Sequence, residues 1–393
     1  MRLLFASYSS STHKQQYYKI ILLLIWIIVQ SFLLWQNGIF ITLEAEKYIS
    51  QAQYFLSTGN LESNNYWLYS TQIFLIAAIS KLRLSFTVIV AIQLLLNLFA
   101  TWMFYKLALY FLRNSLLGFL VTFVFIVNVP YQVYNTFLFT ESIFYSLAVI
   151  YSSYLLRLDK LTIKRLPVII FLLVLLSITR PTGILFFLAT ALYIFFRFLS
   201  HLSFFQKFLI ISCAILFFLF TLNAMLQVGG SLDFMQPFKK ENIICGVPTI
   251  DNADIKTLEK GNSIQGLLYY IFNNGKQFSR LAALKTISFF GLIRNYYSLF
   301  HNIYLVLFFY PFYLLALSGV WKMFKRKSPV FYYMFTIILL YWITTLLTCD
   351  DWHNRFILTV TPFIFLMGFS VFKKENYLDT NQKNKIITKY FPA

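Results

Sequence analysis

Acidic residues and cysteines are scarce in this chain of 393 residues. There are 14 aspartates and glutamates against 33 lysines and arginines, which gives a formal net charge of +19. The three cysteines, Cys213, Cys245 and Cys349, are too few for a disulfide framework and lack the paired spacing of a metal site. Glycine-rich phosphate loops and the HExxH and CxxC patterns are absent, so no motif supports nucleotide chemistry or a bound metal. We therefore expect no cofactor. A divalent metal bound without any of these motifs remains an alternative.

Apolar residues, by contrast, are abundant. The chain is 59% hydrophobic and 20% aromatic, with a mean hydropathy of +0.68, whereas soluble domains are about 45–50% apolar. The excess lies in runs of about 15–25 residues with few charges, the length that crosses the hydrocarbon core as a helix. We therefore predict an all-α polytopic membrane protein, with residues 1–393 forming one integral-membrane domain in a plasma or inner membrane.

About ten membrane-spanning helices are expected, and two features refine the prediction. The first span follows Lys14 and Lys19 as in a signal peptide, but the flank 35–38 lacks a small-x-small cleavage pattern, so the helix is retained. The run 67–80 contains several polar residues and is predicted as an interfacial or re-entrant helix. Asn128 and Pro130, at the end of the third span, predict a kink. The expected spans are residues 18–36, 85–107, 114–129, 138–156, 166–179, 182–199, 207–227, 298–320, 329–348 and 355–372.

The basic residues predict the orientation of these spans. With the N-terminus inside, most lysines and arginines fall in segments that face the cytoplasm, and the short outside turns hold only Arg180 and Arg355. Both termini are therefore expected in the cytoplasm, and the basic excess requires no nucleic-acid partner. Lys47, Lys81 and Arg83, in the first outside segment, are a mild exception to this bias.

Two outside segments are long enough to be functional. The first covers residues 37–84 and the second covers residues 228–297, where two apolar stretches predict helices lying on the membrane. Cys245 and Cys349 would both lie outside and could form one bridge, although we do not expect it from the sequence.

Unusual polar residues gather at the outer ends of the predicted spans. We expect them to line one wet pocket, with acidic groups on one wall and basic groups on the other. They are Glu44, Glu46, Glu141, Arg180, Asp350, Asp351, His353 and Arg355.

Simpler interpretations exist for several of these residues. Glu44 and Glu46 could be a solvated pair. Glu141 could simply stabilise the N-terminus of its helix by interacting with the helix dipole. Tyr48 follows Glu44 by four residues and would share its helical face, which favours Glu44 as the inward carboxylate. Arg180, placed before a proline on the side poor in basic residues, suggests an anionic partner.

Four motifs in order resemble the GT-C glycosyltransferases, the superfamily of the protein O-mannosyltransferases and the lipid A aminoarabinose transferase. They are the acid with Tyr48 in the first outside segment, Thr140-Glu-Ser-Ile-Phe144, Arg180-Pro-Thr-Gly183, and Arg355 followed by Pro362. The likeness covers residues 15–370. Many members have a large C-terminal soluble domain, which we do not expect in residues 1–393, so acceptor recognition would fall to residues 228–297.

The resemblance implies inverting transfer of a sugar from a polyprenyl-phosphate donor to a glycan, lipid or protein acceptor at the extracytoplasmic face. Glu44 would take the position of the catalytic base, with Glu46 as its rival. The other roles would be donor-phosphate binding by Arg180, Arg355 and His353, and substrate binding by Tyr48, Glu141, Asp350 and Asp351.

Two other classes of protein remain as alternatives. One is a polysaccharide polymerase of the O-antigen type, which is also polytopic and has a long outer segment, but for which we see no need of an acid pair. The other is a lipid or sugar flippase or transporter, in which charges or broken helices near mid-span would be expected.

Overall fold

A computed structural model describes residues 2–198, 203–227, 233, 235–247, 255–258 and 261–373. Parts of the predicted second outer segment (228–232, 234, 248–254 and 259–260) lie outside the described residues. So do position 199, at the end of the sixth predicted span, and the basic tail from 374.

The described chain is helical, apart from two isolated β-bridges. Each of the ten predicted spans coincides with a helix. These helices are α1 (Arg2–Asn37), α4 (Thr87–Leu112), α5 (Ser115–Ile126), α7 (Thr140–Leu156), α8 (Leu166–Thr179), α9 (Leu185–Phe198), α10 (Phe204–Gln227), α14 (Leu299–Lys325), α15 (Pro329–Leu347) and α16 (Arg355–Phe369).

Six helices among the described residues are long and apolar enough to cross a membrane, or up to seven if a bent pair counts as one span. The all-α, multi-pass membrane class is therefore confirmed, and the number of ten crossings stays a prediction.

Shorter helices form the connections. They are α2 (Glu44–Thr58), η1 (Asn64–Tyr69), α3 (Ser70–Lys81), α6 (Val129–Gln132), η2 (Val133–Thr136), η3 (Ile163–Arg165), η4 (Pro181–Ile184), α11 (Met235–Lys239), α12 (Ile264–Asn273), α13 (Gly275–Gly291), η6 (Trp352–Asn354) and η7 (Ser370–Phe372).

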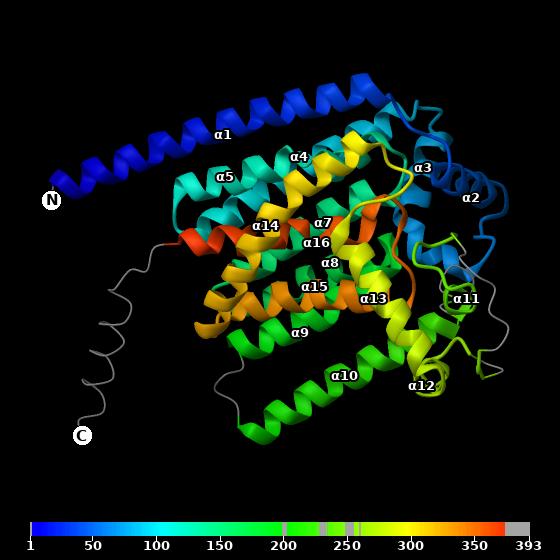
Figure 1. The fold of residues 1–393 in the computed structure, drawn as a ribbon. Helices are drawn as coiled ribbons and strands as arrows, with labels where there is room; N and C mark the ends of the chain where they lie inside the picture. The colour runs from blue at the N-terminus through cyan, green and yellow to red at the C-terminus, as the bar shows by residue number, and fades with distance from the viewer. Residues whose placement is uncertain are drawn as a thin grey trace.

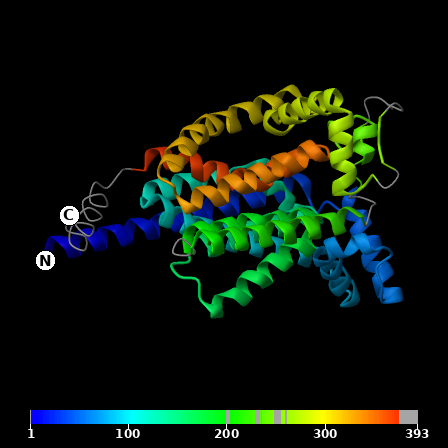
Figure 2. The ribbon, with the colours of Figure 1, turned by 90° about the horizontal axis from the view of Figure 1, so that it is seen from below.

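The long helices run roughly side by side, and α2, α3 and α11–α13 gather at one end of the bundle (Figure 1). The N-terminal end of α1 and the end of α16 lie toward the opposite end, and Figure 2 shows the same division from below. Both long predicted outside segments therefore share one end of the molecule. Which side of a membrane that end faces stays a prediction.

Helices α7 and α16 lie at the centre of the bundle. Nearly all residues of α7 and of α16 are buried, because α7 packs on α4 and α8 while α16 packs on α14 and α15. The first turns of these two helices carry Glu141 and Arg355, so the packing of two apolar helices brings opposite charges into the protein interior.

The approach to α7 is bent, as the sequence predicted. Helix α5 meets the α6–η2 pair at 62°, next to Asn128 and to Pro130 in the first turn of α6. After the bend, two backbone hydrogen bonds join the chain to Phe40, from Phe40 N to Thr136 O at 3.0 Å and from Leu138 N to Phe40 O at 3.1 Å. This link holds the start of the first outside segment beside the start of α7.

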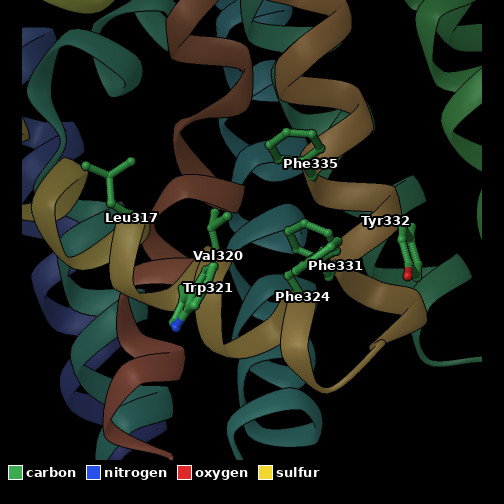
Figure 3. A pocket seen from close by; sticks show the side chains of 7 residues that line it. All are labelled: Leu317, Val320, Trp321, Phe324, Phe331, Tyr332 and Phe335. Atoms are coloured by element: carbon green, nitrogen blue, oxygen red, sulfur yellow. The ribbon is translucent and has the colours of Figure 1, made fainter.

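An apolar groove of about 400 Å³ lies between α14 and α15 (Figure 3). It is lined by Leu317, Val320, Trp321, Phe324, Phe331, Tyr332 and Phe335. Three of these residues stand in the first turns of α15 and the other four in the last turns of α14. Arg355 follows the other end of α15, which rises by roughly 28 Å over its length. The groove is therefore remote from the polar residues singled out in the sequence.

Candidate functional site

Five of the predicted site residues meet in one network of ion pairs, which we call the ion cluster. Its members come from four separate places in the chain, yet each contacts at least one other member. They are Glu44, Glu141, Arg180, Asp351 and Arg355.

Arg355 is the hub of the ion cluster. Its two terminal nitrogens contact both carboxylate oxygens of Glu44, at 2.6 and 3.0 Å. The same nitrogens donate to Glu141 at 2.8 Å and to Asp351 at 2.6 Å. A planar guanidinium can satisfy several carboxylates at once in this way, whereas a lysine ammonium cannot reproduce the bidentate contact.

Arg180 closes the network from the other side. It donates to Glu141 and, at 3.2 Å, to Asp351, so both carboxylates bridge the two arginines. The expectation from the sequence that acids line one wall and bases the other is wrong. The charges alternate, because a buried charge is stable only when an opposite charge and hydrogen bonds surround it.

Helix starts and tight turns place these side chains. Glu44 and Glu141 stand in the first turns of α2 and α7, where the helix dipole favours a negative charge. Arg355 also begins a helix, where the dipole disfavours a cation, so the three carboxylates offset an unfavourable position. It follows two residues with left-handed backbone, His353 (φ 55°) and Asn354 (φ 60°), which turn the chain into α16.

The turn that carries Arg180 depends on a glycine. Arg180 is extended (φ −152°) ahead of Pro181, as the residue before a proline usually is. At Gly183 a Cβ atom would lie 2.3 Å from the carbonyl oxygen of Leu176, closer than any real contact allows. The Arg180-Pro-Thr-Gly motif therefore has a steric reason in addition to its charge.

Glu44 is the accessible member of the ion cluster. Its side chain is 38% exposed, compared with 0% for Glu141 and 7% for Arg355. Burial opposes ionisation of Glu44, but the charge and hydrogen bonds of Arg355, with help from Arg180 and Lys47, outweigh it and hold the pKa of this carboxyl below its usual value. A reacting molecule arriving from water would reach this carboxylate first.

The other predicted site residues lie around the ion cluster. Tyr48 is buried one turn after Glu44, and burial together with the charges of Glu44 and Glu141 raises the pKa of its hydroxyl. Glu46 is exposed. His353 is also exposed, with Nδ1 3.2 Å from the Tyr297 hydroxyl.

Asp350 belongs to a second, separate ion pair. Its Oδ2 accepts from Arg294 and, at 2.8 Å, from the Ser288 hydroxyl. Burial raises the pKa of Asp350, although Arg294 and Ser288 act in the opposite direction. Asp350 thus joins the end of α13 to the segment that carries Asp351 and Arg355.

The segment 349–355 is held in place by the predicted second outside segment. Cys245 and Cys349 form a disulfide, so the sequence-based expectation of no bridge is wrong. Beside it, Asp350 N donates to Ile243 O at 2.8 Å and Cys245 N donates to Asp350 O at 2.9 Å. Bringing the two cysteines together required the fold of the outer segment, which the cysteine spacing does not encode.

Lys285 is a functional candidate that sequence reasoning missed. It is fully buried on α13, and its ammonium donates to the carbonyls of Leu346 (3.3 Å) and Thr348, at the end of α15. A cation there satisfies carbonyls that have no partner within the helix. The signal in the sequence is a lysine directly after the apolar stretch 281–284, one of the two stretches that predict helices lying on the membrane.

Arginines occupy the space between the carboxylates of the ion cluster. Within the described ranges, no three His, Cys, Asp or Glu side chains are arranged to hold a metal ion. If all its members are ionised, the ion cluster has three negative and two positive charges, a net charge of −1. The arrangement can accept a proton at Glu44 and can stabilise an anion only with a further cation or an exchange of partners.

Comparisons with protein-family models and with curated proteins identify no relative. No protein-family model matches the sequence, and none of the curated proteins matches it. A functional interpretation therefore depends on the residues and geometry described above.

Proposed function

We propose that the chain is an inverting glycosyltransferase that uses a polyprenyl-phosphate sugar at the extracytoplasmic face of a membrane. The observation that carries the proposal is the pairing of Glu44 with Arg355, 311 residues apart in sequence, at the exposed edge of a buried ion cluster. A base and an anion-binding group lie side by side there, as transfer from a lipid phosphate requires.

The reaction would use Glu44 as the general base. The acceptor hydroxyl oxygen forms a bond to the anomeric carbon while the bond from that carbon to the phosphate oxygen breaks, with inversion. The hydroxyl proton passes to Glu44, and the lipid phosphate leaves with the bonding electron pair. Arg355 and Arg180 stabilise the charge that develops on the leaving phosphate.

Partner exchange at Arg355 would couple donor binding to base activation. In the free protein Glu44 is held by Arg355, which lowers the pKa of its carboxyl and makes it a weak base. A donor phosphate that takes over hydrogen bonds from Arg355 would release Glu44 toward the acceptor. Glu141 and Asp351, which are nearly inaccessible, would keep both arginines in place meanwhile.

The test is transfer from a panel of polyprenyl-phosphate sugars by purified protein in lipid nanodiscs, with products analysed by mass spectrometry. Glu44→Gln should lower the transfer rate by about 10²–10⁴-fold, the usual contribution of a general base, while donor binding persists. Glu46→Gln, two residues away, is the matched comparison: if it loses transfer and Glu44→Gln does not, Glu46 is the base.

Two further outcomes would count against the proposal. Full activity of both variants would exclude an acid of the first outside segment as the base. Absence of transfer from every donor in the panel would favour the polymerase or transporter alternatives.

A further inference from the structure

The ion cluster lacks one positive charge for binding a phosphate. With a net charge of −1, it would repel a phosphomonoester or phosphodiester even though it contains two arginines. Both arginines are already paired with carboxylates. Arg180 lies 3.2 Å from Asp351, and Arg355 lies 2.6 Å from both Asp351 and Glu44. A lipid-phosphate donor therefore needs another cation at the exposed edge, near Glu44.

Lys47 is that cation. It follows Glu44 by three residues on α2, so the two side chains neighbour each other on one helical face. The charges of Glu44, Arg355 and Arg180 all influence the pKa of its ammonium, as expected for a side chain beside the ion cluster. Within the described part of the chain, no carboxylate lies within ion-pair distance of Lys47, in contrast to both arginines.

Three tyrosine rings surround the Lys47 ammonium. Its Nζ lies 5.1 Å from the ring centroid of Tyr69, 5.4 Å from that of Tyr66 and 6.0 Å from that of Tyr48. Contacts with ring faces stabilise a cation and fix its position, but they do not neutralise its charge. The ammonium is thus held in place and keeps hydrogen-bond donors for an anion.

The environment of Lys47 favours an incoming negative charge. Burial lowers the pKa of Lys47, and the charges of Arg355 and Arg180 act in the same direction, while Glu44 opposes them. Lys47 also belongs to the few basic residues that break the expected charge bias of the first outside segment. A bound phosphate would relieve the repulsion between these three cations.

We propose that Lys47, held among Tyr48, Tyr66 and Tyr69, binds the phosphate of the lipid-linked donor together with Arg355. This inference rests on the proposed function and assigns a binding residue within it. A phosphate bridging Lys47 and Arg355 would lie beside Glu44, since both cations flank that carboxylate. The phosphate would thereby restore the charge balance and take the place of Glu44 on Arg355.

The experiment measures binding of a polyprenyl monophosphate, without sugar, to the full chain in neutral-lipid nanodiscs. Unphosphorylated polyprenol and phosphatidylglycerol are the comparison ligands, so that chain binding and unspecific anion binding are separated. Lys47→Gln should raise the Kd for the polyprenyl phosphate at least tenfold, while Lys47→Arg stays within threefold of wild type. Binding of polyprenol should be the same in all variants.

Lys81 provides the matched control, because it is an exposed lysine of the same outside segment, in the last turn of α3. Lys81→Gln should bind the phosphate as wild type does. Lys47→Met is a second neutral variant that keeps apolar contact with the rings, and it decides the matter if Lys47→Gln does not fold.

The outcomes separate the inference from the proposed function. Normal phosphate binding by folded Lys47→Gln or Lys47→Met, in a protein that prefers the phosphate to polyprenol, overturns the role of Lys47 alone. If the wild-type protein binds the polyprenyl phosphate no more tightly than polyprenol or phosphatidylglycerol, the lipid-phosphate donor itself is excluded.

Discussion

Replacing Arg355 by glutamine should destabilise the folded protein strongly. The change removes four hydrogen bonds to three carboxylates and leaves Arg180 as the remaining cation of the ion cluster. Glu44 can turn toward water, but Glu141 and Asp351 are buried and stay close to each other. Breaking a buried ion pair by removing one partner costs about 3–5 kcal/mol, and we expect about 3 kcal/mol here because Arg180 still contacts both buried carboxylates.

The assay is equilibrium unfolding in detergent micelles followed by tryptophan fluorescence. Removing the matching charge should recover part of the loss. We expect the double variant Arg355→Gln/Glu141→Gln to be more stable, by about 1–3 kcal/mol, than the sum of the single variants predicts. Such a coupling free energy would measure the buried pair itself, apart from unrelated effects of either substitution.

Arg280 is the control for charge removal alone. It pairs with the buried Glu241 carboxylate, which also accepts from Gln277 at 2.9 Å, while the Arg280 side chain itself is 54% exposed. Because Glu241 keeps a hydrogen bond, Arg280→Gln should lower the free energy of unfolding by less than Arg355→Gln does, by about 1 kcal/mol. Our reasoning would be refuted if Arg355→Gln were no more destabilising than Arg280→Gln, or if the two substitutions in the ion cluster were simply additive.

Two further predictions concern the support of the segment 349–355. Burial lowers the pKa of Lys285 to about 7, whereas the pKa of a lysine in the unfolded chain is about 10.4. Between these values the unfolded state binds more protons, so wild-type stability relative to Lys285→Met should rise with pH by up to about 1.4 kcal/mol per unit, measured by unfolding from pH 7 to 10. Reducing the Cys245–Cys349 disulfide should lower the free energy of unfolding by about 2–4 kcal/mol, measured with and without a reductant.

A specific result would contradict each of these two predictions. A pH-independent difference between wild type and Lys285→Met would show that Lys285 does not titrate in this range. For the disulfide, Cys213→Ser removes the exposed free cysteine and should leave the effect of the reductant unchanged. An equal response of Cys245→Ser and the unaltered protein to the reductant would exclude the bridge.

The sequence by itself determined the class of the fold and the positions of its long helices. Apolar runs such as 85–107 and 355–372 coincide with α4 and α16, because an apolar segment of that length can satisfy its backbone only as a helix. The kink near Asn128 could also be predicted, since a proline removes a backbone donor and sterically disturbs the preceding turn. These features depend on neighbours in the chain and are therefore readable from local pattern.

The sequence also singled out all five members of the ion cluster, because charges at the ends of apolar helices are conspicuous. It could not determine how they pair. The contact of Glu44 with Arg355, the separation of Asp350 into its own pair with Arg294, and the disulfide at Cys349 depend on which helices pack together. Such contacts join residues tens to hundreds of positions apart, and many pairings would satisfy the same charges. Only the tertiary structure selects one, by burying α7 and α16 and thereby requiring every charge at their ends to have a partner.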